Sequence, residues 1–287
     1  MATALITGTS TGIGFATALA LGRAGHKVFA TMRDPGRAPE LGETVAAEGL
    51  PVEIMVLDVD SDESVTDAIG GIGDPIDVLI NNAGIERTGS VEELALDEFR
   101  ATMETNYFGP LRCIQAVLPA MRERRSGCII NVTSVAGRLA LSPFAAYTAS
   151  KFALEALSEC LAQEVKAFNI RVAIVEPGII DTPMARRLEV ADEPSPYPQQ
   201  ERIAALFAAT LQNPAPPTLV ADKILDIIDS ATWKLRHPVG PDAVPFLEWR
   251  ASMTDEEWAD WGALDHDAWY DRVEADFGLK ARPEDLE

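Results

Sequence analysis

The sequence contains few cysteines, no long uncharged apolar run and no basic leader. Its three cysteines, Cys113, Cys128 and Cys160, lie far apart without a CxxC pair or a nearby histidine, which leaves no pattern for a disulfide framework or a metal site. We therefore expect reduced thiols in the core. No uncharged apolar stretch reaches the roughly 18 residues of a membrane span, and the chain opens directly on the strand-like residues 3–7. These absences predict a soluble, cytoplasmic protein.

Basic residues are scarce as well. The chain has 24 Lys and Arg against 45 Asp and Glu, a formal net charge of -21. Such a charge repels phosphate backbones and anionic lipid surfaces wherever salt does not screen it. We therefore expect neither nucleic acid nor a membrane as a partner.

Short β-branched runs alternate with longer amphipathic stretches. This alternation is typical of a parallel sheet with crossover helices, and an apolar content of 47% suits one large core in 287 residues. We predict an α/β fold, a doubly wound parallel sheet of the Rossmann type in a single domain. Strands are expected at residues 3–7, 27–32, 52–57, 78–81, 128–132 and 171–175, and helices at 12–24, 97–125 (interrupted near Gly109-Pro110) and 144–168.

The periodicity weakens after Pro177. Residues 181–202 hold three prolines after Pro183, which indicates a mobile loop over a substrate site. Residues 242–287 carry 14 acidic against 4 basic residues with four interleaved tryptophans, and disordered tails are poor in aromatics, so we expect this extension to pack on the parent domain or a neighbouring subunit. The expected organisation is a dinucleotide-binding and catalytic domain at 1–241, with its substrate loop at 181–202, and a C-terminal extension at 242–287.

A glycine-rich segment, Gly8-Thr9-Ser10-Thr11-Gly12-Ile13-Gly14, lies between the first predicted strand and the first predicted helix. Glycines there let the backbone turn sharply and approach a pyrophosphate, whose charge the helix N-terminus stabilises. Phe15-Ala16 follows in place of the Lys-Ser/Thr pair of a nucleotide triphosphatase loop, which excludes phosphoryl transfer. A plain turn of small residues stays an alternative for this segment taken alone.

The same glycine-rich segment also fits the G-x-S-x-G pattern of a serine hydrolase. Its base would have to be His26, His237 or His266, the three histidines of the chain. A hydrolase of that fold also takes an oxyanion-hole amide from a loop on an earlier strand, and almost no chain precedes residue 8. The hydrolase interpretation is therefore disfavoured.

Tyr147 and Lys151 lie four residues apart in a helical pattern, which places phenol and ammonium on one face. A free tyrosine has a pKa near 10, and a neighbouring cation can lower it by stabilising the phenolate, so Tyr147 could exchange protons near neutral pH. Ser134 follows the strand at 128–132, where its hydroxyl could orient a carbonyl oxygen. Each residue alone also has an ordinary explanation, as a half-buried tyrosine, a solvated lysine and a turn or cap serine.

Taken together, these residues resemble the short-chain dehydrogenase/reductase family from about Thr3 to Thr182. The family's motifs occur in the family's order: the glycines of the first loop, Asn81-Asn82-Ala83-Gly84, Ser134, Tyr147 with Lys151, and Pro177-Gly178 with Thr182. The resemblance implies an NAD(P)-dependent oxidoreductase that moves a hydride between nicotinamide and a carbonyl or alcohol. It also implies a homodimer or homotetramer.

The resemblance implies a role for each catalytic residue. Tyr147 would be the general acid and base, Ser134 would bind the substrate oxygen, and Lys151 would bind the nicotinamide ribose and lower the tyrosine pKa. Asn106 would position a water that links Lys151 to solvent, a role that an amide allows because it both donates and accepts. A buried amide satisfied within its helix is the alternative for Asn106.

The resemblance also implies a cofactor set. Asp58 would contact the adenine, the segment from Asn81 to Gly84 would support the cofactor wall, and Thr182 would hold the nicotinamide carboxamide. The full expected set is Gly8, Ser10, Thr11, Gly12, Ile13, Gly14, Arg33, Asp58, Val59, Asn82, Ala83, Gly84, Tyr147, Lys151, Pro177, Gly178, Ile180 and Thr182.

The residues at the end of the second strand predict which cofactor is used. NAD-selective enzymes commonly place a carboxylate there, which would repel a 2′-phosphate. Thr31 occupies that position here, and Arg33 offers a planar cation suited to bidentate phosphate contact. We therefore expect NADP(H) to be preferred. NAD(H) stays possible, because Asp34 could pair with Arg33 or supply the carboxylate.

One other class of function stays open, a catalytically silent NAD(P)-binding redox sensor or interaction protein of the same fold. The complete catalytic set argues against it. The substrate itself is not specified, because the loop at 181–202 holds both the apolar Met184 and the basic Arg186 and Arg187, which would suit an apolar or an anionic molecule. Residues 235–242 resemble a late strand and turn of relatives that reduce bulky carbonyls.

Overall fold

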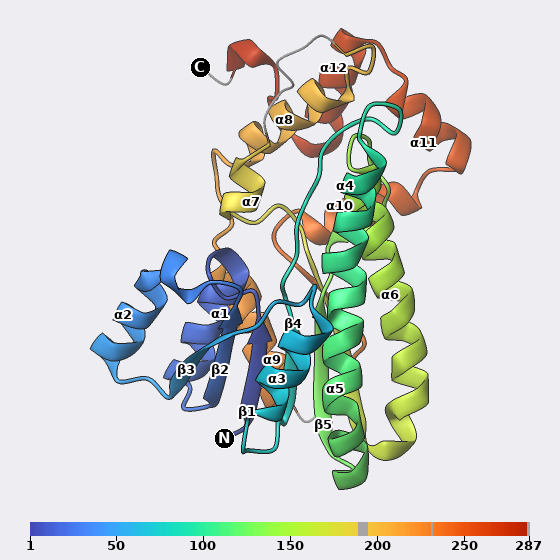
Figure 1. The fold of residues 1–287 in the computed structure, drawn as a ribbon. Coiled ribbons are helices and arrows are strands. Elements are labelled where there is room, and N and C mark those ends of the chain that lie inside the picture. The colour runs from blue at the N-terminus through green and yellow to red at the C-terminus, as the bar shows by residue number, and fades with distance from the viewer. Residues whose placement is uncertain (189–194, 231, 286–287) are drawn as a thin grey trace.

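The computed structural model describes residues 1–188, 195–230 and 232–285 (Figure 1). Its strands form one seven-stranded sheet in the order β3-β2-β1-β4-β5-β6-β7, with every neighbouring pair parallel. The order reverses between β1 and β4, where open α/β sheets bind their ligands. The strands are β1 (Thr3–Thr7), β2 (Lys27–Met32), β3 (Val52–Val56), β4 (Val78–Asn81), β5 (Gly127–Val132), β6 (Ile170–Pro177) and β7 (Arg236–Val239).

This sheet confirms the predicted doubly wound fold. Each of the six strands expected from the β-branched runs is present, with ends that differ by at most two residues. β7 falls within the segment 235–242 that was expected as a late strand. The β-branched runs succeed as a signal because strands covered on both faces consist almost wholly of apolar residues.

Helices cover both faces of the sheet, and alternate residues of each strand face opposite layers. Ala4 and Ile6 pack with helices α1 (Gly12–Arg23), α2 (Pro39–Glu48) and α9 (Thr218–Asp229). Leu5 between them packs with the opposite layer, which comprises α3 (Asp62–Gly70), α5 (Gly109–Arg124) and α6 (Ala145–Val165). Figure 1 shows α5 and α6 running side by side along this face.

The helix expected at residues 97–125 is interrupted by a π-helical turn. Helix α4 (Leu96–Met103) leads into the turn at Glu104–Phe108, and α5 follows directly from Gly109. The interruption therefore lies just before the predicted Gly109-Pro110, because Pro110 lacks the amide that would donate back to this turn. The π turn contains Asn106, and such turns often occur at functional sites.

A helical cap lies beyond the carboxyl ends of the strands (Figure 1). It consists of α7 (Pro183–Arg186), α8 (Gln199–Thr210), α10 (Ala243–Ala251), α11 (Asp255–Gly262) and α12 (His266–Phe277). Residues of α8, α11 and α12 share one buried cluster that includes Ile203, Leu206, Trp261 and Trp269. The predicted substrate loop at 181–202 thus begins and ends in helices, and its residues 189–194 lie outside the described part of the chain.

Two composition-based expectations can be compared with the structure. Cys113 and Cys128 are buried free thiols, as predicted, but Cys160 is exposed, so its assignment to the core is wrong. Cys160 lies on the solvent-facing side of α6, which its apolar neighbours in the sequence did not indicate. Across the described ranges, no helix is both long and apolar enough to cross a bilayer.

Candidate active site

The loop between β1 and α1 takes backbone conformations that favour glycine. Gly8 and Gly12 have φ values of 73° and 59°, in the left-handed region. A Cβ on Gly14 would lie 2.2 Å from the Gly8 carbonyl oxygen. These glycines therefore let the start of α1 close tightly over the end of β1.

The N-terminus of α1 suits a pyrophosphate. Ser10, Thr11, Gly12 and Ile13 line the central cavity. Within the described residues, the N-cap Thr11 makes no side-chain cap hydrogen bond, and the first turn of α1 carries no acidic side chain. Amide groups at a helix start, together with the helix dipole, attract such an anion. The residues present thus fit the diphosphate of a dinucleotide.

The end of β2 differs in part from the sequence-based expectation. Thr31 is fully buried inside the strand and its hydroxyl donates to the Ile6 carbonyl at 2.9 Å, so it is turned away from the cofactor side. Arg33, the first residue after β2, is exposed and lines the cavity. The Asp34 carboxylate accepts a hydrogen bond from the Gly36 N–H at 3.0 Å and caps the next turn. Arg33 is thus the charged side chain that faces the cavity here.

The segment after β4 braces the glycine loop. The Asn82 side-chain amide donates to the carbonyls of Thr7 and Gly8, at 3.0 and 2.9 Å. The Thr7 hydroxyl accepts from the backbone amides of Asn82 and Ala83, each at 3.1 Å. Asn82, Ala83 and Gly84 also line the cavity, so one side of this segment holds the loop while the other faces a ligand.

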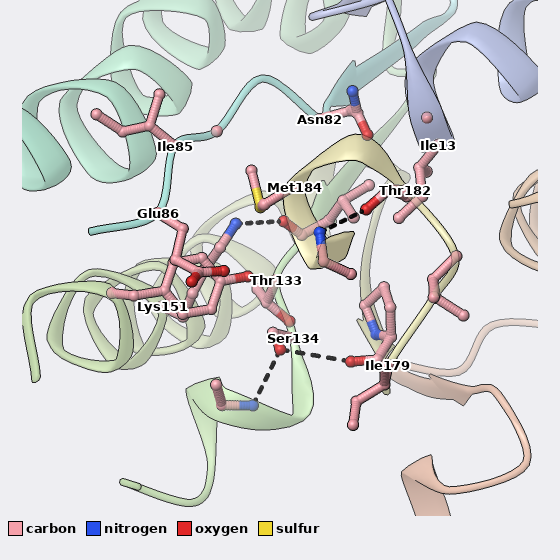
Figure 2. A pocket seen from close by; sticks show the side chains of 18 of the residues that line it. Ile13, Asn82, Ile85, Glu86, Thr133, Ser134, Lys151, Ile179, Thr182 and Met184 are labelled. Carbon is pink, nitrogen blue, oxygen red and sulfur yellow. Dashed lines mark hydrogen bonds between the residues drawn. The ribbon is translucent and has the colours of Figure 1, made fainter. Parts of the chain in front are cut away.

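Ser134, Tyr147 and Lys151 line the same cavity, whose volume is about 340 Å³. Figure 2 shows Ser134 and Lys151 in it. The Ser134 Oγ lies just beyond β5 and accepts from the Ala136 N–H at 3.1 Å. Tyr147 and Lys151 share one face of α6, with the Lys151 Nζ 5.6 Å from the centre of the Tyr147 ring. The structure therefore brings together three catalytic candidates that lie on two separate elements.

The electrostatics of this cluster differ from the expected lowering of the tyrosine pKa. Burial and the Glu86 carboxylate raise the pKa of Tyr147 above its ordinary value, and the nearby Ser134 hydroxyl opposes them. Burial lowers the pKa of Lys151 to about 8 against the opposing effect of Glu155. The Lys151 ammonium donates to the Val132 carbonyl at 3.0 Å. In this arrangement the cost of burying a phenolate is the largest influence on the pKa of Tyr147.

Asn106 lies behind the cavity rather than on its wall. It is fully buried, its Nδ2 donates to the Ile85 carbonyl at 2.8 Å and to the Ser150 hydroxyl at 2.9 Å, and its Oδ1 accepts from the Ile85 N–H at 2.8 Å. These bonds join the π turn to α6 and to the segment after β4. Asn106 therefore fixes the backbone that carries Glu86.

The segment after β6 completes the predicted cofactor side of the cavity. Pro177, Gly178, Ile180 and Thr182 line the cavity. The Thr182 hydroxyl accepts from the Ala185 N–H at 3.2 Å and caps α7. Among the predicted cofactor residues, Gly14 alone is absent from the lining, and its role is the close packing described above.

The basic side chains of the predicted substrate loop do not line the cavity. Met184 lines the cavity, as Figure 2 shows, but the Arg186 guanidinium is paired with the Asp181 carboxylate. Arg187 is exposed outside the lining. The described part of this loop therefore presents an apolar rather than a cationic surface.

Sequence reasoning missed the residues at the substrate end. Glu86 lines the cavity just past the Asn82-Ala83-Gly84 motif, and only its nearness to that motif could have suggested it. The far end is an aromatic wall, which we define as Phe207, Phe246, Trp249, Trp261 and Phe277. The sequence shows the tryptophans of the extension, but their place on the cavity depends on how α10 to α12 fold back.

Comparison with known proteins identifies the family. A sequence model described as short chain dehydrogenase matches residues 2–193. The chain belongs to the short-chain dehydrogenase/reductase family. It is 37% identical over 265 residues to retinol dehydrogenase 8 of Bos taurus. The aligned region covers 87% of this chain and 85% of the bovine protein.

Solved structures of family members share the fold. A short-chain dehydrogenase from Streptomyces avermitilis superposes with a TM-score of 0.77 at 36% identity, covering 91% of this chain and 95% of that one. An actinorhodin polyketide ketoreductase crystallised with NADPH gives a TM-score of 0.74 at 28% identity, covering 84% and 97%. As a short-chain dehydrogenase/reductase, the protein is an NAD(P)-dependent oxidoreductase of small molecules.

Proposed function

We propose that this protein transfers a hydride between NADP(H) and a carbonyl or alcohol substrate, with Tyr147 as general acid and base. The observation that carries the proposal is the single cavity shared by the glycine loop and by Ser134, Tyr147 and Lys151. A bound nicotinamide supplies or accepts the hydride. Side chains of the protein bind the cofactor, position the substrate and transfer the proton.

Proton transfer at the substrate oxygen is assigned to the Tyr147 hydroxyl. In reduction it gives its proton to the oxygen that becomes the alcohol, and in oxidation it takes that proton back. The Ser134 hydroxyl, next to Tyr147, donates to the same oxygen and fixes its position. The raised pKa of the phenol favours its protonated form, which is the form that reduction requires.

Lys151 and Asn106 support the proton transfer by Tyr147. The Lys151 ammonium has three donors, and its bond to the Val132 carbonyl leaves two for the ribose hydroxyls of the cofactor. Its charge near the ring favours the phenolate once the tyrosine has given up its proton. Asn106 holds the backbone at Ile85 and, through it, the cavity wall beside Lys151. We also assign to Asn106 the positioning of a water that links Lys151 to solvent.

NADP(H) is the preferred cofactor in this proposal. Arg33 lines the cavity at the carboxyl end of β2, and among the described residues it forms no ion pair. Asp34, the competing carboxylate, is engaged in capping the following turn. The NADPH in the polyketide ketoreductase structure supports the same choice. A free guanidinium at this place suits the 2′-phosphate.

We further propose a cytoplasmic homodimer or homotetramer. The net charge of -21 opposes binding to nucleic acid and to anionic membranes. Size-exclusion chromatography with light scattering would measure the oligomeric state directly.

The test is cofactor oxidation with a panel of carbonyl compounds. NADPH binding is followed by the nucleotide's fluorescence, and turnover by the loss of its absorbance with aryl ketones, keto-lipids, quinones and keto-sugars. Turnover with at least one of them that depends on Tyr147 supports the proposal. NADPH binding without oxidation by any of them would instead support a silent sensor of the same fold.

A further inference from the structure

The aromatic wall of the cavity comes mainly from the C-terminal extension. Four of the five residues of the aromatic wall, Phe246, Trp249, Trp261 and Phe277, belong to residues 242–287. The ring of Trp249 lies 5.0 Å from that of Trp261 and 4.8 Å from that of Phe277, both edge-on. Such packing provides a large apolar surface with little freedom to rearrange.

Hydrogen bonds hold this wall in place. The Trp249 indole N–H donates to the Asp276 carboxylate at 3.1 Å. The neighbouring Trp258 donates to the Ala140 carbonyl, at 3.0 Å, and so ties the extension to the segment between β5 and α6. The wall is therefore fixed relative to the catalytic residues.

Aromatic rings connect the wall to the catalytic phenol. The Phe144 ring centre lies 6.5 Å from that of Tyr147 and 5.8 Å from that of Phe207. A molecule whose reacting carbon lies at Tyr147 would thus extend along apolar rings. Such a surface selects a flat or chain-like apolar body.

Glu86 interrupts this apolar lining with a carboxyl group. Its Oε1 accepts a hydrogen bond from the Thr88 hydroxyl at 3.0 Å, and within the described chain no cation pairs with it. The adjacent Arg87 guanidinium is paired with Glu98 instead. Burial raises the pKa of Glu86 to about 7. Figure 2 shows this side chain in the cavity with Lys151 and Ser134.

A carboxyl group at this place has a cost. Its charge acts on Tyr147 and disfavours the phenolate that alcohol oxidation needs. A partly buried carboxylate without a full set of partners is itself unfavourable. A hydrogen-bond donor on the substrate would relieve both effects, since a carboxyl group accepts in either protonation state.

We propose that the cavity takes amphiphilic carbonyl substrates, in which the aromatic wall holds an apolar body and Glu86 accepts a hydrogen bond from a hydroxyl or amino group next to the reacting carbonyl. This inference rests on the proposed function. It narrows the substrate to α-hydroxy or α-amino ketones with a large apolar part.

The experiment uses a naphthyl ethyl ketone that carries hydrogen, hydroxyl, methoxy or amino on the carbon next to the carbonyl. The methoxy compound matches the hydroxy compound in its electronic effect but cannot donate. For the wild type we expect kcat/KM with NADPH to be at least about tenfold higher for hydroxy than for methoxy, the effect of one charge-assisted hydrogen bond. A ratio below about twofold would overturn the role of Glu86.

Variants of Glu86 separate its charge from its hydrogen bond. In Glu86→Leu the hydroxy-to-methoxy ratio should fall to about one. Glu86→Gln, whose amide oxygen still accepts, should keep part of this ratio. Glu123→Leu, an exposed glutamate outside the cavity, is the matched control and should keep the wild-type ratio. An unchanged ratio in Glu86→Leu contradicts the inference.

The aromatic wall is tested by comparing the naphthyl hydroxyketone with hydroxyacetone, which lacks the apolar body. In Phe207→Ala the ratio of their kcat/KM values should fall about tenfold. Only the larger substrate buries apolar surface against the Phe207 ring, so only that substrate loses this contact. An unchanged ratio would place the substrate elsewhere.

Failure of the proposed function would be visible separately. If wild-type protein oxidises NADPH with none of these ketones, the reaction assignment fails. The hydroxy and methoxy compounds are then compared by their dissociation constants, measured by quenching of tryptophan fluorescence. Equal affinities for the hydroxy and methoxy compounds in that assay would overturn the inference about Glu86 as well.

Discussion

The backbone N–H of Ile179 donates a hydrogen bond of 2.7 Å to the carboxylate of Asp242. This bond links the segment after β6, which lines the cofactor side, to the first residue of the C-terminal extension. A Cβ on Gly178 would lie 2.1 Å from the same carboxylate, so the two segments pack without space between them.

Asp242→Ala should lower the melting temperature by about 2–5 °C, because the Ile179 amide loses a charged acceptor worth about 1.5–3 kcal/mol. Asp242→Asn, which still accepts through its amide oxygen, should lose about half as much or less. Differential scanning calorimetry measures both. Equal melting temperatures for the alanine variant and the wild type would show that the bond does not stabilise the fold.

Truncation after Pro241 tests the extension as a whole. It removes four residues of the aromatic wall and exposes Ile203 and Leu206 of α8, which pack with Trp261 and Trp269 in one buried cluster. We expect a lower melting temperature or a changed oligomer size, together with greater binding of a hydrophobic dye. A truncated protein that matches the full chain in all three measurements would show that the extension is an appendage.

Tyr147→Phe should abolish turnover while leaving the dissociation constant of NADPH nearly unchanged. The substitution removes the transferable proton and keeps the packing of the ring against Phe144. Steady-state kinetics and titration of the nucleotide's fluorescence give the two quantities. Activity within tenfold of the wild type would refute the role of the phenol.

Arg33→Ala should raise the KM for NADPH by roughly tenfold to a hundredfold and barely affect NADH. This range corresponds to one charge-assisted contact with the 2′-phosphate. Arg37→Ala is a suitable control, since Arg37 is exposed nearby but does not line the cavity. An equal loss for both cofactors, or a wild-type preference for NADH, would contradict the assignment.

Glu86→Gln should move the pH profile of alcohol oxidation to lower pH. The Glu86 charge raises the pKa of Tyr147, so removing it favours the phenolate and shifts the rising limb of kcat/KM down by about 0.5–1 pH unit. The profile is measured with the alcohol product of whichever ketone is reduced. A shift toward higher pH would show that Glu86 aids rather than opposes ionisation.

The pH dependence of stability should report on Glu176, a buried carboxyl in β6. Burial and the charge of Glu155 raise its pKa from 4.5 to about 7, so the folded state holds this proton more tightly than the unfolded state does. Its contribution to the free energy of unfolding is therefore greatest below pH 4.5 and falls by about 1–3 kcal/mol as the pH rises to about 7.

Glu176→Gln should flatten this decline, because the amide does not titrate. The guanidinium nitrogens of Arg138 and Arg236 lie 3.5 and 3.4 Å from Glu176 Oε1, close enough to solvate the amide oxygen in its place. Urea unfolding at several pH values between 4 and 8 would measure the difference. A variant whose stability falls with pH as steeply as the wild type would assign the decline to other groups.

The sequence predicted the sheet well and the substrate end poorly, for a physical reason. Strands such as β1 and β4 are buried on both faces, so composition alone marks them, and the glycine loop must keep Gly8 and Gly12 in left-handed conformations. The position of Glu86 relative to Tyr147 depends instead on long-range contacts, among them the bonds from Asn106 to the backbone of Ile85.

The same distinction applies to two side chains near the cavity. Thr31 occupies the position predicted to select the cofactor, but its hydroxyl donates to the Ile6 carbonyl inside the sheet. Burial raises the pKa of Tyr147, and the depth of burial is not encoded in the four-residue spacing of Tyr147 and Lys151.

Chain order separates the two ends of the cavity. The seven strands of the described sheet all end by Val239, whereas Phe246, Trp249 and Trp261 follow them in helices α10 and α11. A substitution confined to α10, α11 or α12 can therefore change the aromatic wall while every strand and the glycine loop keep their sequence. We expect the choice of substrate and the choice of nucleotide to vary independently among proteins built on this plan.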